Sequence, residues 1–334
     1  MTMATTTMPE TPESAPSPSP ATIPVTLVAG YLGAGKTTWL NRHLRAGVEA
    51  GTLVLVNDFG AINIDAELID YRGDRLLALD NGCLCCSLSD ALGAQLSRIA
   101  RWPEPPTALI IETSGVALPG RIADMIRVMR QFHLFTIVTL VDLYALPRHR
   151  RDGRIADLIE SQIASADRLS LNRGKTLAPN VLATSKAWLD AINSRATLET
   201  LDPRNALGLA TDQSMTTAAG RQHAEPVAPR FCLPEVEAEG LPNWQHFTRR
   251  LTPIPDKDSL ETRLDRHASA VARAKGFIQV GTHHYVFHWS GGRASWTPTA
   301  PRAGAGQLVG IGFAGAELNV LLEALDELIA STGR

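Results

Sequence analysis

The sequence predicts an α/β protein in which a mainly parallel sheet is followed by a smaller α+β domain. Short continuous apolar runs alternate with helical patterns between residues 25 and 171, as is typical of strands buried on both faces of a sheet. Polar residues follow several of these runs, at the edge where such sheets bind ligands. After Trp244 the pattern changes to short alternating strands, which predicts the second domain.

The segment Gly30-Tyr31-Leu32-Gly33-Ala34-Gly35-Lys36-Thr37 has every position of the phosphate-binding P-loop pattern. It lies between an apolar run at 25–29 and a helical pattern at 38–44. Backbone N–H groups of such a loop surround an anion, and the helix N-terminus adds its positive dipole end. Lys36 is expected to reach the β- and γ-phosphates, and the Thr37 hydroxyl is expected to bind Mg²⁺. The first domain is therefore a predicted P-loop NTPase domain, whose nucleotide-binding residues include Gly30, Gly33, Ala34, Gly35, Lys36, Thr37 and Thr38.

The remaining elements follow in chain order. In the first domain we expect helices at 90–100 and 155–164, and strands at 52–56, 76–79, 108–111, 135–141 and 169–171. In the second, a capping-box-like start at 258–261 predicts a helix with Leu260, Leu264 and Val271 on one face. A last helix carries Leu318 to Leu328, and strands are expected at 276–280, 284–289, 294–297 and 308–313.

Composition shifts suggest the boundaries of the domains. Residues 1–23 are rich in Thr, Ser and Pro and are expected to form a disordered tail. The P-loop domain is expected at 24–202, a Pro-, Ala- and Gly-rich linker or lid at 203–243, and the C-terminal α+β domain at 244–334.

Three acidic residues come at strand ends near the expected phosphates. Glu112 fits the magnesium-orienting acid of P-loop enzymes best, because four apolar residues precede it, and Asp58 is the second candidate. Lys36, Glu112 and Asp58 are thus the predicted catalytic residues. Asp142 is equally well explained as a helix N-cap. Gly115 is expected to approach the γ-phosphate, so 112–115 and 57–65 are the candidate switch segments.

A cluster of cysteines, Cys83, Cys85 and Cys86, follows Asn81-Gly82. Thiolates at this spacing suit Zn²⁺ or another transition metal, and three of them leave one tetrahedral position open. Such an incomplete shell is typical of a site that loads and releases metal. Buried small side chains or a redox switch are the alternatives.

Three histidines, His283, His284 and His288, lie in one expected hairpin. Strand alternation puts His284 and His288 on the same face, where they could form a second metal site. Half-exposed strand residues are the other interpretation, and it is the commoner case.

The net charge of the chain indicates which kinds of binding partner are disfavoured. A formal net charge of −2 and a pI near 6.5 favour neither nucleic acid nor an anionic membrane surface. No apolar run approaches the roughly 20 residues of a membrane helix. Cysteines that cannot form a disulfide framework, together with a P-loop, predict a cytoplasmic setting.

Several motifs together resemble one family, the CobW-type P-loop GTPases, which are relatives of the nickel-insertion GTPases of urease and hydrogenase. The similarity extends from about residue 25 to 334, with the cysteine motif in the family's order after the P-loop. The matching segments lie at 30–38, 56–60, 81–86, 111–115, 141–142, 161–168, 201–206 and 273–277.

The resemblance implies a metallochaperone-like GTPase in which metal at the cysteines is coupled to GTP hydrolysis. It implies GTP and Mg²⁺ at the nucleotide site, and zinc, or else cobalt, as the metal. A metal-requiring client protein is the implied partner, and a homodimer that shares the metal fits an incomplete thiolate shell. It also makes Asn172 and Arg173 the start of the base-reading motif.

The chain departs from this family in its base-reading motif, which is Asn172-Arg173-Gly174-Lys175 instead of Asn-Lys-x-Asp. Lys175 cannot accept the hydrogen bonds that a carboxylate takes from guanine, so ATP is a second candidate substrate. Ser185-Lys186 is a candidate substitute. Ala61 also replaces an acid of the family, and the histidine-rich tract between the domains is absent.

Two other functions fit the same residues. A phosphotransferase would use an arginine-rich lid, for which Arg148, Arg150, Arg151 and Arg154 are available. A non-hydrolysing, nucleotide-gated binding module is the third interpretation. The leading hypothesis is a nucleotide hydrolase, using GTP first, that couples hydrolysis to the binding and delivery of a transition metal.

Overall fold

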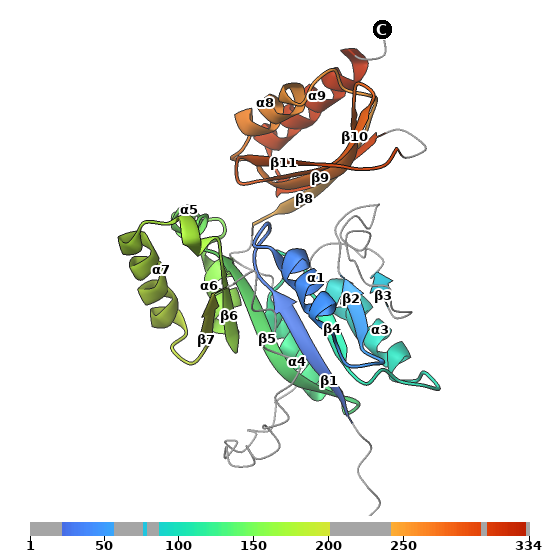
Figure 1. Cartoon of the computed structure of the whole chain (residues 1–334), viewed down its shortest axis with the longest axis vertical. Coiled ribbons are helices and arrows are strands. Elements are labelled where there is room, and N and C mark those ends of the chain that lie inside the picture. Colours follow the sequence, from blue (N-terminus) through green and yellow to red (C-terminus); the bar gives the residue numbers. More distant parts are fainter. Residues whose placement is uncertain (1–21, 57–75, 79–86, 201–241, 302–305, 332–334) are drawn as a thin grey trace, which may run out of the picture.

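The computed structural model describes residues 22–56, 76–78, 87–200, 242–301 and 306–331. Within these ranges the chain forms a seven-stranded and a five-stranded sheet. The P-loop lies at one end of the seven-stranded sheet, and the five-stranded sheet lies beyond that same end (Figure 1). Among the described helices, none combines the length and the apolar character needed to cross a membrane.

The seven-stranded sheet, called the P-loop sheet below, is parallel at every pairing and has the order β3-β2-β4-β1-β5-β6-β7. All residues of β2 and β4 are buried, as expected for strands covered on both faces. The predicted α/β class is therefore confirmed. The strands are β1 (Ile23–Ala29), β2 (Leu53–Val56), β3 (Leu76–Ala78), β4 (Leu109–Glu112), β5 (Phe132–Asp142), β6 (Arg168–Asn172) and β7 (Thr197–Thr200).

Helices cover both faces of the P-loop sheet (Figure 1). On one face Leu27 and Ile111 pack against Leu96 and Ile126, and on the other Val28 packs against Leu40. Alternate residues of one strand thus serve two cores. The helices are α1 (Lys36–Ala46), α3 (Ser87–Ile99), α4 (Pro119–Val128), α5 (Leu146–His149), α6 (Ala156–Ala164), the 3₁₀ turn η1 (Gly174–Thr176) and α7 (Pro179–Ile192).

The five-stranded sheet, called the C-terminal sheet below, is antiparallel with the order β11-β10-β9-β12-β8. Leucines of two helices and the rings of Phe287 and Trp289 form its core. The strands of this sheet are β8 (Trp244–Leu251), β9 (Val271–Val280), β10 (His283–Ser290), β11 (Arg293–Pro298) and β12 (Gly306–Phe313). The helices that pack on it are α8 (Asp258–Arg266) and α9 (Ala316–Ser331).

Some predicted elements need correction. Val271 opens β9 and does not belong to the face of α8 that carries Leu260 and Leu264. The start of α8 is capped two residues before the predicted position, because Asp256 Oδ1 accepts the Ser259 N–H at 2.7 Å. The helices α4 and α7 and the strands β7 and β8 were not predicted.

The boundaries of the domains stay predictions, but the first lies close to an observed change. β1 begins at Ile23, the last residue of the predicted tail, so that residue is part of the sheet. Residues 1–21 and 201–241, which include most of the predicted tail and linker, lie outside the described ranges.

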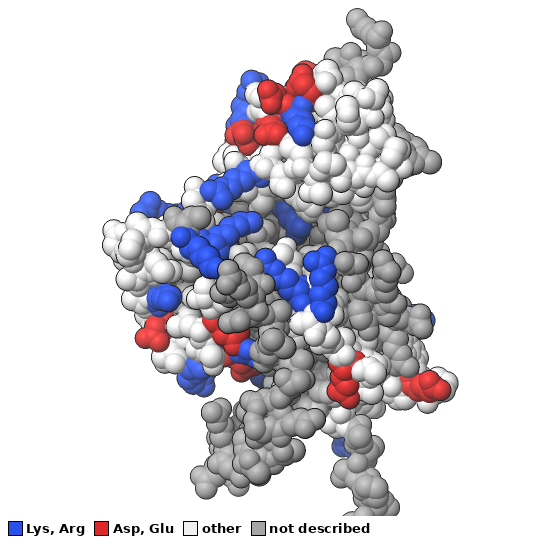
Figure 2. Space-filling model, viewed as in Figure 1, with Lys and Arg blue, Asp and Glu red and all other residues white. Residues whose placement is uncertain are grey.

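The two sheets meet in a mixed core. Tyr31, Leu146 and Ile159 from the P-loop side share one apolar cluster with Ala272 and Ile311 of the C-terminal sheet. Lys and Arg side chains gather over the face of the molecule where the two sheets meet (Figure 2). Exposed arginines lie in α5 and in the turn that follows it, namely Arg148, Arg150, Arg151 and Arg154.

Candidate functional site

The P-loop connects β1 to α1 with a backbone that requires glycine. Gly30 has φ +131°, and a Cβ there would lie 2.4 Å from the Leu140 carbonyl oxygen. Gly35 has φ +102° and forms the N-cap of α1, so the helix starts at Lys36 and its N-terminus lies at the loop. This is the geometry of an anion site at a helix N-terminus.

Lys36 lies inside this loop. Its side chain is only 5% exposed, and its Nζ donates to the carbonyl oxygens of Gly30 at 2.9 Å and of Tyr31 at 3.4 Å. A buried ammonium is stable only with such partners. The loop therefore holds the charge of Lys36 at the place where the sequence predicts phosphates.

Thr37 and Glu112 meet at the start of α1. The Thr37 hydroxyl donates to Glu112 Oε1 at 2.9 Å, and Glu112, the last residue of β4, is 3% exposed. Hydroxyl and carboxylate oxygens are the ligands that Mg²⁺ takes beside phosphate. The structure thus brings together the two residues for which the sequence predicts magnesium roles. Thr38 is exposed in the first turn of α1.

The segment after β4 packs directly against the P-loop. Thr113 and Ser114 are buried, and a Cβ on Gly115 would lie 2.6 Å from a methyl group of Leu32. Gln162 of α6 donates from Nε2 to the carbonyl oxygens of Gly115 at 3.1 Å and Ala117 at 2.9 Å. The amide of Gln162 therefore fastens the end of the candidate switch segment 112–115 to α6, while the Thr113 N–H donates to the Val28 carbonyl oxygen of β1 at 2.9 Å.

Gln162 is a residue that sequence reasoning did not single out. The sequence feature that could have indicated it is a polar residue on the apolar face of the helical pattern at 155–164. Replacing Gln162 with leucine leaves the two carbonyl oxygens without their donor, at about 1–3 kcal/mol for each group. We expect the free energy of unfolding in urea to fall by about 2–6 kcal/mol. Ser161→Ala, on the exposed side of α6, should change it by less than about 0.5 kcal/mol.

The end of β6 is also fastened to the P-loop. Asn172 Nδ2 donates to the Ala34 carbonyl oxygen at 3.0 Å, and a Cβ on Gly35 would lie 2.7 Å from that nitrogen. Asn172 Oδ1 accepts the N–H of Arg173 at 2.9 Å. The predicted base-reading segment thus starts beside the phosphate loop.

Arg173 and Asp142 form an ion pair at the same edge. Arg173 has φ +57°, and among described residues other than glycine no other φ is positive. Asp142 Oδ1 also accepts the N–H groups of Tyr144 at 3.0 Å and Ala145 at 3.4 Å, so it closes a turn before α5. It is not the helix N-cap that the sequence suggested, because the N-cap of α5 is Ala145. In the suggested substitute Ser185-Lys186, Ser185 is buried within α7 and Lys186 is exposed on it, and the base-reading role of the pair stays a prediction.

Several predicted site residues lie outside the described ranges. They are Asp58 with the rest of the candidate switch segment 57–65, and the cysteines Cys83, Cys85 and Cys86. Within the described ranges no three His, Cys, Asp or Glu residues form a group that could hold a metal. The described histidines His283, His284 and His288 therefore do not form such a site with their described neighbours.

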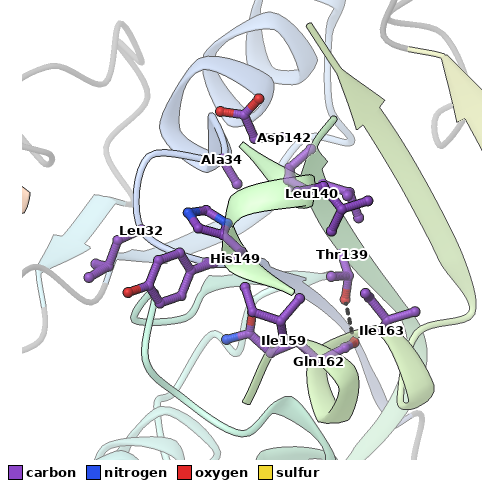
Figure 3. Close-up of a pocket in the computed structure, with 12 residues that line it drawn as sticks. Leu32, Ala34, Thr139, Leu140, Asp142, His149, Ile159, Gln162 and Ile163 are labelled. Carbon is purple, nitrogen blue, oxygen red and sulfur yellow. Dashed lines mark hydrogen bonds between the residues drawn. The ribbon is translucent and has the colours of Figure 1, made fainter. Parts of the chain in front are cut away.

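A cavity of about 20 Å³, room for one water molecule, lies behind the P-loop (Figure 3). Leu32 and Ala34 line it together with His149 and Gln162, and Thr139 donates to the Gln162 carbonyl oxygen at 3.1 Å. Burial, aided by the charge of Arg148, lowers the pKa of His149 from 6.5 to about 4. The imidazole is therefore neutral at pH 7.

This pKa makes the stability depend on pH in a defined direction. Between pH 6.5 and 4 the unfolded chain binds a proton at His149 that the folded chain does not, so acid destabilises the fold. The full shift corresponds to about 3 kcal/mol. We expect His149→Phe to remove this loss, measured as the difference between the urea stabilities of the two proteins from pH 7 to 4. A pH-independent difference would contradict the assignment.

The fold and this site together define a P-loop nucleotide-binding domain. The family model described as "CobW/HypB/UreG, nucleotide-binding domain" matches residues 24–199. The chain therefore belongs to the CobW/HypB/UreG family.

Two curated proteins illustrate the similarity. The zinc chaperone YjiA of Escherichia coli is 34% identical over 187 residues, which are 54% of this chain and 57% of YjiA. The zinc-regulated GTPase metalloprotein activator 1 of Schizosaccharomyces pombe is 31% identical over 184 residues, which are 52% and 44% of the two chains. The chain thus spans about half the length of the curated relatives it matches.

Among solved structures, the Zn(II)-bound YjiA GTPase from E. coli is similar over 92% of this chain and 99% of its own. The sequence identity is 21% and the TM-score is 0.41.

Proposed function

We propose that this chain is a GTP hydrolase that couples hydrolysis to the binding and delivery of a transition metal, zinc first, to a client protein. The arrangement of Lys36 and of the Thr37–Glu112 pair around the P-loop carries this proposal. We place this cycle of nucleotide hydrolysis and metal delivery in the cytoplasm. GTP is the first candidate substrate, and ATP is the second because Lys175 replaces a guanine-reading carboxylate.

The chemistry follows from these residues. The P-loop N–H groups and the Lys36 ammonium would stabilise the negative charge that grows on the transferring phosphoryl group. Thr37 and Glu112 would hold Mg²⁺, which neutralises phosphate charge when bound. Gly115 packs on the P-loop and accepts a hydrogen bond from Gln162. Binding of the γ-phosphate beside Gly115 would therefore change the position of the segment 112–115.

The metal end of the cycle is proposed at Cys83, Cys85 and Cys86, which follow β3 in the chain. Three thiolates suit zinc but leave its fourth position open. The client, or a second copy of this chain, would supply the fourth ligand. The names of the relatives, a zinc chaperone and a GTPase metalloprotein activator, support zinc, GTP and a client.

The test is phosphate release by reduced, metal-free protein with GTP and with ATP, each with and without one equivalent of Zn²⁺. We expect zinc to raise GTP turnover, and Cys85→Ser to abolish this stimulation while nucleotide affinity stays the same. Cys232→Ser, at the cysteine outside the cluster, is the matched control and should keep the stimulation.

Three outcomes would contradict the proposal. Undiminished zinc stimulation in Cys85→Ser would separate the cysteines from the nucleotide site. Phosphate transfer to an added acceptor would favour the phosphotransferase, although Arg150 already stacks on Trp188 and Arg154 is bound by Asp152. Tight binding without hydrolysis would favour the binding module.

A further inference from the structure

The P-loop carries one aromatic residue, Tyr31, that is buried between the two sheets. Its side chain is 7% exposed, and its ring contacts that of His149 edge-on with centroids 4.9 Å apart. The ring of Trp244, the first residue of β8, lies 6.5 Å away. The carbonyl oxygen of the same Tyr31 accepts from Lys36 Nζ. One residue thus takes part in the phosphate loop and in the junction of the sheets.

A hairpin of the C-terminal sheet touches the P-loop at a second point. A Cβ on Gly33 would lie 2.6 Å from the Ser290 hydroxyl oxygen and 3.1 Å from Ser290 Cβ. Ser290 ends β10, and the two residues after it, Gly291 and Gly292, have φ +61° and +74°. Two positive φ values are typical of the tight two-residue turn that keeps a hairpin in register. The contact therefore comes from a well-defined turn.

Further contacts make this junction a packed interface. Arg154 donates from Nη1 to the Ser269 carbonyl oxygen at 2.9 Å and stacks on Phe313 at 3.8 Å. Phe313 in turn stacks on Trp244 with centroids 4.8 Å apart. A second cavity of about 20 Å³ lies between Tyr31, Arg154 and Ser290. Apart from this small cavity the junction is filled by packed rings, and such packing transmits small shifts.

We propose that Ser290 and Trp244 are positioning residues for the nucleotide site, which hold Gly33 and Tyr31 of the P-loop in the phosphate-binding shape. Nucleotide binding and docking of the C-terminal sheet are then coupled, and by linkage each favours the other. The proposal rests on only one part of the proposed function, namely that the P-loop binds a nucleotide. It gives the C-terminal sheet a direct part in the nucleotide cycle.

The first test is the affinity of the full-length protein for GDP and for a non-hydrolysable GTP analogue, measured by calorimetry. Trp244→Ala removes a ring that packs near Tyr31, so fewer molecules hold the competent loop, and affinity should fall about 5- to 50-fold. In turnover, KM should rise by the same factor while kcat changes less than about twofold, because the bound state is unaltered. Tyr285→Ala is the matched control, since its ring contacts Trp296 and Lys257 within the C-terminal sheet.

A second variant and a second measurement cover the case in which Trp244→Ala does not fold. Ser290→Leu adds bulk where Gly33 has no room, and it too should weaken nucleotide binding. In the wild-type protein, nucleotide should slow amide hydrogen exchange in 244–248 and 288–293, although neither segment belongs to the P-loop. The proposal would be overturned if both folded variants bound nucleotide as tightly as the wild type. It would also be overturned if nucleotide did not change the rate of amide hydrogen exchange in 244–248 and 288–293. A failure of zinc stimulation would leave it standing.

Discussion

Replacing Lys36 with alanine should reduce nucleotide turnover by about 10²–10³-fold, the effect of removing one pre-organised charge donor from a transition state. The loss is expected to be large because the ammonium is already seated in the loop, at 2.9 Å from the Gly30 carbonyl oxygen, and needs little reorganisation. Phosphate release under saturating nucleotide measures it.

Arg101→Ala is the matched control, because Arg101 is an exposed cation just after α3. Its turnover should equal that of the wild type. A Lys36→Ala protein that is folded and keeps more than about a tenth of the activity would show that hydrolysis does not use this site.

Replacing Glu112 with glutamine should have the second largest effect. The side chain keeps its size but loses the charge that would hold Mg²⁺ next to Thr37, so kcat should fall by about 10²-fold. The magnesium concentration needed for half-maximal turnover should also rise. Steady-state rates across a magnesium titration give both quantities.

Glu160→Gln, an exposed carboxylate on α6, serves as the control for loss of charge. The assignment of Glu112 to magnesium would be wrong if the variant had an unaltered magnesium requirement. The hydrogen bond from Thr37 to Glu112 would then be structural only.

The P-loop sheet and the phosphate site were predictable because their signals are local. A loop such as 30–37 has a fixed pattern of glycines, and buried strands such as Leu53–Val56 are continuous apolar runs. The meeting of Thr37 with Glu112 followed from a general rule, that the carboxyl ends of neighbouring parallel strands share one edge.

Residues that act through distant partners were not predictable in this way. Gln162 binds a carbonyl oxygen 47 positions earlier, and Asn172 binds one 138 positions earlier. Nothing in the neighbouring sequence encodes these partners. The contacts of Ser290 and Trp244 with the P-loop depend likewise on how two separate sheets dock.

Missed or shortened elements have local physical reasons. The first half of β9, Val271–Lys275, consists largely of residues that favour helices, and Lys275 is buried at 4% exposure, so polar-apolar alternation fails there. The start of α4 contains Pro119 and Gly120 and reads as a loop, although proline is well suited to a first helical turn.

The position of β1 at the centre of the P-loop sheet has a consequence for synthesis of the chain. Val25 pairs with Leu109 on one side, and Leu27 pairs with Ile137 on the other. During synthesis β1 therefore waits about 80 further residues for its partner β4, which takes about 4–16 s at 5–20 residues per second. During this time its apolar side chains and its unpaired backbone groups are exposed, so a chaperone that binds nascent apolar segments is expected to bind just before the phosphate loop.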